Sequence, residues 1–531
     1  MRFHSLLPML PSAVAALPSS SSASFSNIVN QTTCGSTTYS YTGLEGYGFV
    51  PSNATDKYGD TMGGFGSSAA FDLSTWQRTS PNTYTGIIYC LPDRGWNTNG
   101  TLNFQPRIHT FNLTLQLSPN ASATHPSPPN IHLHYLDTLL LTGPDNAPLT
   151  GLDAITTTTN TTTTTTQYPN FPPLPIATYP GDGFGGPGPG GHHIPLDAEG
   201  LALPAHDPAH IWVSDEYGPY VYKFDKHTGR MVYAIQPPQA YLPRRNNTLS
   251  FSADSPPIYD AELVPIPEDP STGRDNNQGF EGLTISSDGK KLYTLLQSAL
   301  NQEGGLKKKY RDQARLLQYD ISNSSRVDAV YEAEYVVTLP KYYNPEKGHD
   351  IVAAQSEIHP LPTGDFLVLA RDSGFGHGQS DSLSVYRHAD IFHISTNTTT
   401  DLKNLRGVDA PNGTIASDKG ILHDGITSAE YCPFLDYNVP GQLAKFGLHN
   451  GGEQDEWLLN EKWESLALVP VNPDTEDSST NSGGEKEYFL FSISDNDFIT
   501  QDGYMNFGRF RYADGSGYNL DNQVLAFRVR F

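Results

Sequence analysis

Short apolar or alternating runs, bounded by Gly, Pro, Asp or Asn, dominate the pattern of hydrophobic and polar positions along the chain. Such runs occur at residues 211–214, 291–296, 365–370, 488–493 and 524–529. Their length and boundaries are typical of β-strands, and clear amphipathic helical patterns are nearly absent. Asp288 and Gly289 tolerate the left-handed backbone of a tight hairpin. The pattern therefore predicts an all-β protein built largely of hairpins.

Repeated hairpins with wide, variable loops favour a β-propeller, in which each blade is a small antiparallel sheet whose first strand lines a central channel. The pattern leaves the number of blades open. Polar or Gly- and Pro-rich insertions interrupt it at residues 19–24, 156–166, 181–191 and 474–485. Because these insertions carry too little apolar surface to pack, we expect long solvated loops between or within blades rather than domain linkers.

The chain divides into an N-terminal β segment, residues 16–178, and the main propeller pattern, residues 179–531. Strand-like runs such as residues 107–117 mark the N-terminal segment. We expect this segment to supply the first blade and the strand that closes the ring. A separate small domain is the alternative.

Residues 1–15 have the features of a secretory signal peptide. Arg2 gives a weak positive start, an apolar stretch follows, and residues 13–15 form a small-residue cleavage pattern. No later stretch has the ~18 consecutive apolar residues that a membrane helix requires. Ten Asn-x-Ser/Thr sequons agree with a secretory route, at Asn30, Asn53, Asn99, Asn112, Asn120, Asn160, Asn246, Asn323, Asn397 and Asn412. We therefore expect a secreted, extracellular glycoprotein that is not inserted in a membrane.

The chain has three cysteines, Cys34, Cys90 and Cys432, so one must stay unpaired or act between chains. Proximity in the sequence favours a bridge between Cys34 and Cys90, although spacing alone leaves the pairing open. Three cysteines do not make a disulfide scaffold, so a hydrophobic core must hold the fold.

The formal net charge of −24 argues against nucleic acid as a partner, because phosphate backbones are held by clustered Lys and Arg. The same charge makes the binding of any polyanionic substrate dependent on local basic groups or on bridging cations.

One short phrase occurs three times: a Glu, then Gly or Ser, then an alternating apolar run. Its glutamates are Glu199, Glu281 and Glu464. Each can present a carboxylate at the lip of a buried strand, and in a propeller the three come from different blades and converge on the channel. Like charges at close range favour a bound divalent ion, so the phrase predicts a metal centre. Alternatively, the glutamates only pin inner strands by accepting backbone hydrogen bonds.

Two further carboxylates, Asp215 and Asp495, end predicted strands. Oxygen-rich clusters of this kind suit Ca²⁺, which takes about 6 to 8 oxygen ligands in flexible geometry. We therefore predict calcium as the ion and add Asp215 and Asp495 to the three glutamates as ligands. Taken alone, each of these clusters is more typical of an acidic turn that caps a strand.

Five segments in order along the chain resemble the phytase-like family, also called the esterase-like activity of phytase family: Asp215-Glu-Tyr-Gly-Pro-Tyr, Gly279-Phe-Glu-Gly-Leu-Thr, Phe366-Leu-Val-Leu-Ala-Arg-Asp, Trp463-Glu-Ser-Leu-Ala-Leu and Ser494-Asp-Asn-Asp-Phe. The similarity extends from about Asp197 to the C-terminus and leaves residues 31–178 largely outside. Ser465 stands where Gly is commoner. The resemblance implies a propeller-like β fold but no particular reaction, because fold does not fix function.

The resulting hypothesis is a calcium-supported hydrolase of phosphoric esters, in which carboxylates hold the metal and the metal bridges the substrate phosphate to an acidic protein. Arg371, at the end of its strand, and His359, ahead of that strand, are candidate phosphate or acid/base residues. Structural roles are the more usual explanation for both: an ion pair of Arg371 with Asp372, and a turn histidine.

Two alternatives remain at this point. The same metal could serve a carboxylic ester or lactone, although no Gly-x-Ser-x-Gly elbow is present and Ser516 has glycines directly on both sides. Alternatively, the propeller is a non-catalytic extracellular binding or structural module. The sequence leaves open the choice between a small anionic and an ester substrate, as well as the oligomeric state.

Overall fold

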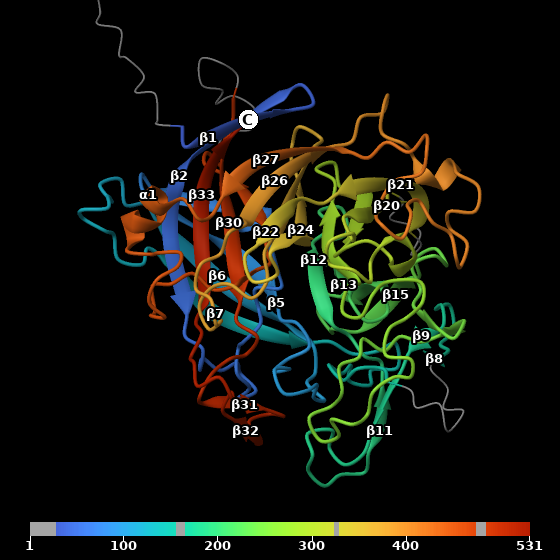
Figure 1. Cartoon of the computed structure of the whole chain (residues 1–531). Helices are drawn as coiled ribbons and strands as arrows, with labels where there is room; N and C mark the ends of the chain where they lie inside the picture. Colours follow the sequence, from blue (N-terminus) through green and yellow to red (C-terminus); the bar gives the residue numbers. More distant parts are fainter. Residues whose placement is uncertain (1–27, 156–164, 323–328, 474–484) are drawn as a thin grey trace, which may run out of the picture.

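The computed structural model describes residues 28–155, 165–322, 329–473 and 485–531. The predicted signal peptide, residues 1–15, lies outside the described residues, as do the serine-rich residues 19–24. Nearly all regular structure within these ranges is β-strand (Figure 1). The predicted all-β class is therefore confirmed.

Five antiparallel sheets of four or more strands are arranged around a common axis, which confirms the β-propeller (Figure 1). Blade 1 consists of β3 (Ser68–Phe71), β4 (Gln77–Ser80), β5 (Thr83–Leu91), β6 (Arg107–Gln116) and β7 (Ile131–Leu140). Blade 2 consists of β12 (Ala198–Ala202), β13 (His210–Asp215), β14 (Val221–Asp225) and β15 (Met231–Ile235). Blade 3 consists of β18 (Phe280–Ile285), β19 (Lys291–Leu296), β20 (Gln313–Asp320) and β21 (Val330–Thr338).

Blade 4 consists of β24 (Ala354–Pro360), β25 (Phe366–Arg371), β26 (Arg387–His393) and β27 (Glu430–Asp436). Blade 5 combines both ends of the described chain: β28 (Lys462–Trp463), β29 (Ala467–Pro470), β30 (Glu487–Asp495), β33 (Asn522–Arg530), β2 (Thr37–Val50) and β1 (Asn30–Cys34). In blades 1 to 4 the chain starts at the innermost strand and then runs outwards through successive antiparallel strands.

The loops between these strands carry only small elements. The short strands are β8 (Thr165–Thr166), β9 (Leu174–Pro175), β10 (Ala177–Tyr179), β11 (Gly191–His193), β16 (Arg244–Arg245), β17 (Thr248–Leu249), β22 (Lys341–Asn344), β23 (His349–Val352), β31 (Gly503–Met505) and β32 (Phe510–Tyr512). The short helices are η1 (Leu73–Thr75), η2 (Asn301–Glu303), η3 (Leu402–Asn404), α1 (Pro440–Leu443) and η4 (Ala444–Phe446).

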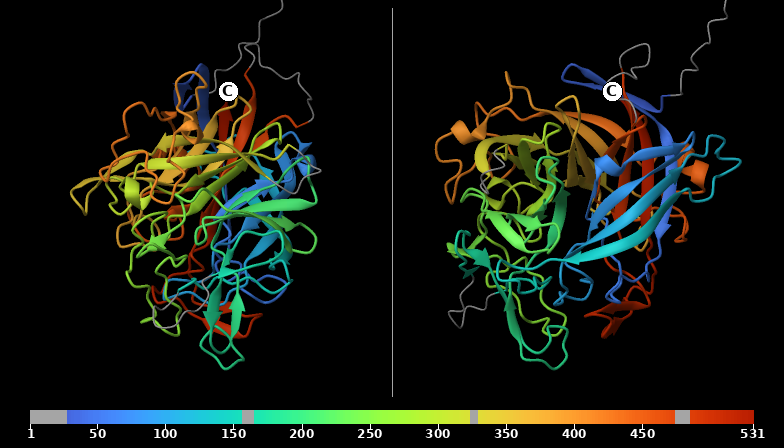
Figure 2. Two further views of the ribbon diagram at one scale, coloured as in Figure 1. Left: turned by 90° about the vertical axis from the view of Figure 1, so that its right-hand side faces the viewer. Right: turned by 180° about the vertical axis from the view of Figure 1, so that it is seen from behind.

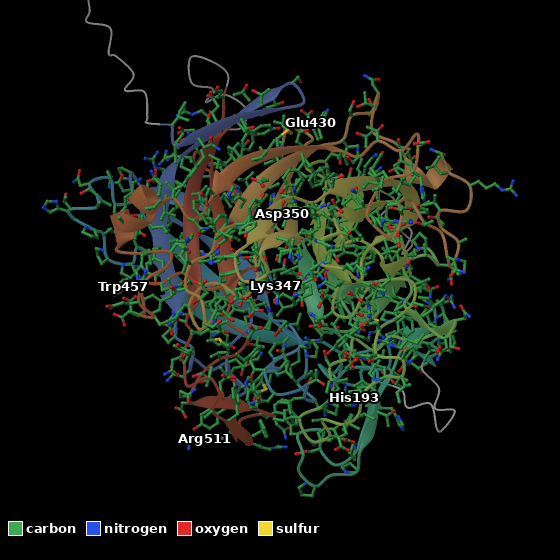
Figure 3. The ribbon with its side chains drawn as sticks, viewed as in Figure 1. His193, Lys347, Asp350, Glu430, Trp457 and Arg511 are labelled. Carbon is green, nitrogen blue, oxygen red and sulfur yellow. A yellow bond between two sulfur atoms is a disulfide. The ribbon has the colours of Figure 1, made fainter. Side chains whose placement is uncertain are left out.

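The ring is closed by strand β2, which pairs with β33 from Ser40 opposite Arg530 to Val50 opposite Asn522. Strand β1 continues outwards from β2 and reaches β27 of blade 4. A disulfide joins Cys34 of β1 to Cys432 of β27, and Gly35 N donates to Glu430 Oε2 beside it (Figure 3).

The expected bridge between Cys34 and Cys90 is therefore wrong. Cys90 lies in β5 of blade 1, where it is buried and has a free thiol. The expectation failed because closure of the ring carries β1 away from blade 1, so sequence proximity does not become spatial proximity. The two bridged residues are 398 positions apart in the sequence.

A separate hydrophobic core fills each of the five spaces between neighbouring blades. Between blades 5 and 1, for example, Tyr84 meets the ring of Phe489 edge-on at 5.0 Å between centroids. Between blades 3 and 4, Tyr293 and Phe366 meet at 4.8 Å. Figure 2 shows the strands of blade 1 packed beside those of blade 5. Each blade is thus stabilised by apolar surface buried on both its faces.

Near the axis the inner strands touch: β12 contacts β3 and β18, β18 contacts β24, and β3 contacts β29. A Cβ atom on Gly200 would lie 2.4 Å from the Cβ of Leu283 in the next blade, and one on Gly282 would lie 2.9 Å from Ile358 Cγ1. Contact between neighbouring blades therefore explains why glycine follows Glu199 and Glu281 in the repeated phrase.

We expect Gly200→Ala to destabilise the protein by about 1–3 kcal/mol, because its methyl group overpacks the contact between blades 2 and 3. Gly441→Ala in α1 is the matched control, since a Cβ there meets nothing within 4 Å. Urea denaturation of both variants measures the difference. Equal midpoints for Gly200→Ala and the wild-type protein would contradict this account of the repeated small residue.

Candidate acidic centre at one end of the channel

The three glutamates of the repeated phrase lie at the beginnings of inner strands, where the pairing with the second strand is irregular. In β12 the register shifts between Ala198 and Leu201, and in β18 between Phe280 and Gly282. Glu199 and Glu281 are the residues at these β-bulges, and Glu464 lies between β28 and β29. A bulge re-aims one side chain out of the regular alternation. All three carboxyl groups are buried.

The three glutamates come from three blades and influence one another electrostatically. Burial raises the pKa of Glu199 well above its usual value, and the charges of Glu281, Glu216 and Glu464 raise it further. Burial likewise raises the pKa of Glu281, with further contributions from Glu216 and Glu464. The carboxyl groups of Glu199, Glu281 and Glu464 thus lie near enough to influence one another, and we call this region the acidic centre.

Asp197, Glu199 and Glu216 form the first group of this centre, with one carboxylate oxygen of each within 4.8 Å of the others. Within the described chain, Glu216 Oε1, Glu281 Oε2 and Glu464 Oε2 are buried without a hydrogen-bond partner. Asp197 lies 2.9 Å from Arg94 Nη1, but neither of its oxygens accepts an aligned hydrogen bond. Buried oxygens without partners are costly unless a further group satisfies them.

Asp93, Asp495 and Asp497 form the second group, and the Lys462 ammonium lies against it. Lys462 Nζ is 2.9 Å from Asp495 Oδ2, 2.8 Å from Asp497 Oδ1 and 3.6 Å from Glu464 Oε2. The second group therefore already has a cation, whereas the first group has only the partial contact of Asp197 with Arg94. Despite Lys462, burial raises the pKa of Asp495 to about 8.

Arg371 lies at this end of the channel. Its Nη2 is 2.5 Å from Glu464 Oε1 and its Nη1 is 3.8 Å from Glu461 Oε1, while Nε has no hydrogen-bond partner in the described residues. The expected structural pair with Asp372 is not formed, since Arg371 only donates to the backbone carbonyl of Asp372. Arg371 is therefore a counter-charge of the acidic centre.

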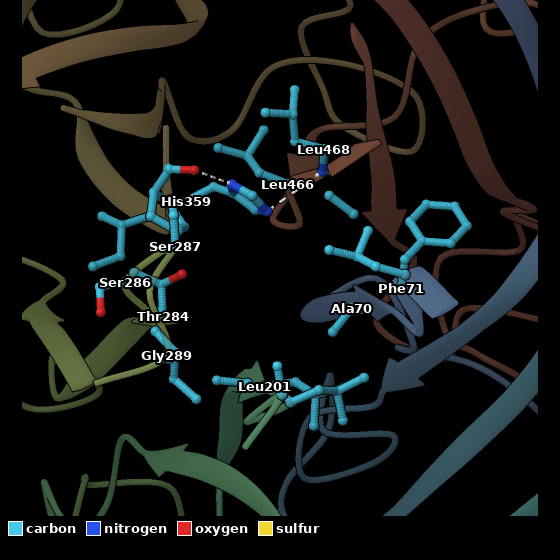
Figure 4. A pocket seen from close by; sticks show the side chains of 18 of the residues that line it. Ala70, Phe71, Leu201, Thr284, Ser286, Ser287, Gly289, His359, Leu466 and Leu468 are labelled. Carbon is cyan, nitrogen blue, oxygen red and sulfur yellow. Dashed lines mark hydrogen bonds between the residues drawn. The ribbon is translucent and has the colours of Figure 1, made fainter. Parts of the chain in front are cut away.

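His359 and Arg371 do not lie together. Each stands near the C-terminal end of its strand, and because β24 and β25 are antiparallel, these ends are at opposite ends of the hairpin. His359 lies near the end of β24 and borders a cavity of about 520 Å³ (Figure 4). Its Nδ1 donates to the Pro360 carbonyl and its Nε2 accepts a long bond of 3.4 Å from Leu468 N. Burial lowers the pKa of His359 to about 4, so the ring is neutral.

Asp215 does not join the acidic centre as a free ligand. Its Oδ1 accepts from the backbone N–H groups of Asp197 and Tyr217, and its Oδ2 accepts from Gly218 N and the Tyr222 hydroxyl. Both oxygens are therefore occupied in shaping the turn after β13.

Sequence reasoning missed several members of the centre: Asp93, Arg94, Asp197, Glu216, Asp497 and Lys462. The sequence could have indicated three of these acids, because each stands within two residues of a predicted ligand: Asp197 near Glu199, Glu216 next to Asp215, and Asp497 near Asp495. Asp93 and Arg94 follow β5 of blade 1, in the segment with no recognised motif. Only the ring brings them to the other blades.

Glu357 was also missed, and it separates the acidic centre from the cavity. Its Oε2 accepts from the Ser68 hydroxyl at 2.5 Å and its Oε1 accepts from Leu283 N at 3.2 Å. Ser68 Oγ in turn accepts from Leu201 N at 3.0 Å. These bonds tie four of the five inner strands together at one level of the channel.

We expect the raised pKa of Glu216 to make the stability of the protein depend on pH. Burial raises its pKa from 4.5 to about 8, so the folded protein holds this proton where the unfolded chain releases it. Without divalent cations, stability is therefore lost as the pH rises from 4.5 towards 8. Gln cannot titrate, so Glu216→Gln does not lose stability in this way. The melting temperature of Glu216→Gln minus that of the wild-type protein should therefore increase as the pH rises from 4.5 towards 8. Melting in chelator at pH 5 and pH 8 tests this, with the exposed Glu453→Gln as control; an unchanged difference would contradict it.

The chain is similar to known proteins in sequence and, more loosely, in structure. A protein of Arthroderma benhamiae described as an uncharacterized secreted protein is 58% identical over 480 residues, covering 90% of each chain. A putative 6-phosphogluconolactonase from Bacteroides uniformis aligns over 87% of this chain and 88% of its own, with 10% identity and a TM-score of 0.27. A luciferin-regenerating enzyme aligns over 88% and 92%, with 10% identity and a TM-score of 0.25. Superpositions this loose carry no functional argument.

Across the residues that the structure describes, no helix is long and apolar enough to span a membrane. The family model described as phytase-like, esterase-like activity of phytase, matches residues 76–478. The match begins in blade 1, well before the start near Asp197 that the motifs indicated, and ends before the fifth motif at residues 494–498. It covers more than half of the chain. The chain therefore belongs to the phytase-like family.

Proposed function

We propose that the protein is a secreted, calcium-dependent hydrolase of phosphoric esters whose centre is the acidic end of the channel. The observation that supports this most directly is the set of buried carboxylate oxygens on Glu216, Glu281 and Glu464 that accept no hydrogen bond from the described residues. The family description, which names phytase and an esterase-like activity, supports the reaction class. The secreted relative from Arthroderma benhamiae supports the location.

The residues of the centre fit a calcium ion. Asp197, Glu199 and Glu216 supply the closest group of oxygens, and Glu281 and Glu464 supply further unpartnered oxygens. All are carboxylates, the hard ligands that Ca²⁺ prefers. In the proposal these five residues hold the ion. Asp495 supports it indirectly by fixing Lys462, and Asp215 has no part because its oxygens are occupied.

The acidic centre has more carboxyl groups than cationic side chains, which also favours a bound cation. Eight carboxyl groups meet at this end of the channel: Asp93, Asp197, Glu199, Glu216, Glu281, Glu464, Asp495 and Asp497. Among the described residues, only Arg94, Arg371 and Lys462 form ion pairs with them. An uncompensated excess of negative charge in a buried site is unfavourable, and a divalent cation removes much of that cost.

The chain's own residues would then orient the substrate and move protons. Arg371, whose Nε is unpartnered and whose Nη1 is only loosely held, would donate to the phosphoryl oxygens. Glu216, with a pKa of about 8, would hold or release a proton near neutral pH. A bound calcium ion would supply electrostatic stabilisation of the charge that develops on the ester. His359 has no role in the reaction, because Glu357 and the inner strands separate it from the centre.

Hydrolysis of a carboxylic ester or lactone is the second candidate, and one observation favours it. Each of the three cations already pairs with a carboxylate, so little positive charge remains for a phosphate dianion. A neutral ester would not need that charge.

We expect calcium titration by calorimetry to detect binding, and Glu281→Gln to weaken it by at least about tenfold because it removes an unpartnered ligand oxygen. Hydrolysis of 4-nitrophenyl phosphate should fall on chelation, return with calcium, and fall in Glu281→Gln. The exposed Glu453→Gln is the matched control and should behave as wild type.

Other outcomes separate the candidates. Calcium-dependent hydrolysis of 4-nitrophenyl acetate but not of the phosphate would favour the carboxylic ester reaction. Phosphate release that neither chelator nor Glu281→Gln affects would sink the mechanism. Absence of calcium binding by the folded protein would favour a non-catalytic binding or structural role for the propeller.

A further inference from the structure

The cavity at the other end of the channel is a second concave site, distinct from the acidic centre. It is lined by all five blades, through residues of β3, β12, β18, β24 and β29, and has a volume of about 520 Å³. Figure 4 shows its labelled side chains surrounding an open space. Cavities of roughly 300–1,000 Å³ accommodate small organic molecules.

The walls of this cavity are predominantly apolar. Ala70, Phe71, Leu201, Leu466 and Leu468 surround it, and no Lys or Arg occurs among its lining residues in the described chain. At its inner end lies Glu357, whose carboxyl group accepts three hydrogen bonds and whose pKa burial raises well above the usual value. An anionic ligand would therefore lose its hydration without gaining a cation.

Most polar groups of the lining are already used within the protein. The Ser286 hydroxyl donates to Asp288 Oδ1 at 2.6 Å, and the Ser287 hydroxyl donates to the Leu361 carbonyl at 3.4 Å. His206 Nε2 lies 3.0 Å from the Asp288 carbonyl. These groups hold the loop after β18 and are not needed to recognise a ligand.

Two polar atoms differ from this pattern. The Thr284 hydroxyl makes no hydrogen bond within the described residues, and Figure 4 shows it directed towards the open space. His359 donates through Nδ1 to a carbonyl, which fixes Nε2 as the acceptor, and Nε2 receives only the 3.4 Å bond from Leu468 N. One donor and one weakly used acceptor are thus available in an otherwise apolar cavity.

We propose that this cavity binds a neutral, mainly apolar small molecule that carries one hydroxyl group. The apolar part would occupy the space between the blades, and the hydroxyl group would accept from Thr284 and donate to His359 Nε2. This site does not depend on calcium or on the proposed reaction, because none of the residues that line it belongs to the acidic centre.

Calorimetric titration with 1-octanol tests the proposal, with octanoate as the charged control at pH 8. We expect saturable binding of 1-octanol and at least about tenfold weaker binding of octanoate, whose carboxylate finds no cation. Ala70→Trp, which fills the cavity, should abolish octanol binding, while Trp at the exposed Ala410 should leave it unchanged. Glu216→Gln should also leave it unchanged, because that residue belongs to the acidic centre.

A second pair of variants keeps the test meaningful if Ala70→Trp fails to fold. Thr284→Val has nearly the same shape but lacks the hydroxyl group, and should weaken 1-octanol binding by about three- to tenfold. Thr284→Ser restores the hydroxyl group and should recover most of the affinity.

No saturable octanol binding to wild type, or equal binding by Ala70→Trp, would overturn the site. Equal binding of octanoate, or no effect of Thr284→Val, would overturn the proposed ligand class.

Discussion

Around the propeller axis the inner strands of neighbouring blades touch directly, and most other features of the molecule depend on this contact. It requires a small residue at Gly200 and Gly282, because a side chain there would meet the next blade. Beside these residues the inner strands β12 and β18 are bulged, which turns Glu199 and Glu281 out of the regular alternation. Farther along the inner strands, Glu357 of β24 ties four blades together through Ser68, Leu283 and Leu201. The close contact between inner strands is thus associated with the acidic glutamates at one end of the channel and with the bonds of Glu357 beside the cavity at the other.

The two ends differ sharply in electrostatics. At one end, carboxyl groups from several blades are buried together, and their raised pKa values record the cost of holding like charges away from water. Lys462 offsets this cost in one group only. At the other end, the polar groups are mostly paired with one another and the wall is apolar. A single channel therefore offers two chemically opposite surfaces a short distance apart.

The sequence predicted the fold well because strand periodicity and turn chemistry are local properties. It also identified Glu199, Glu281 and Glu464, since repetition along the chain becomes symmetry around a ring. It could not identify Asp93, because Asp93 stands in no repeated position and only the closed ring brings it to the other blades. Lys462 stands two residues before Glu464, but its contact with Asp495 depends on the pairing of β28 with β30, which the sequence does not show. Asp215 was predicted as a metal ligand from its motif at the end of a strand. The turn in that motif uses both carboxylate oxygens of Asp215 as hydrogen-bond acceptors. His359 and Arg371 were both predicted as phosphate or acid/base residues, but they stand at opposite ends of the β24–β25 hairpin and so at opposite ends of the channel.

Closure of blade 5 by β2 and β33 also affects the order in which the chain can assemble. Strand β2 emerges from the ribosome long before its partner β33. Until then β2 has an unpaired edge, which is a template for pairing with other chains. Cys432 is synthesised well before β33, so the bridge to Cys34 can hold β1 against blade 4 while the gap is still open. In an oxidising secretory compartment, that tether would keep the waiting strand beside the place it must finally occupy.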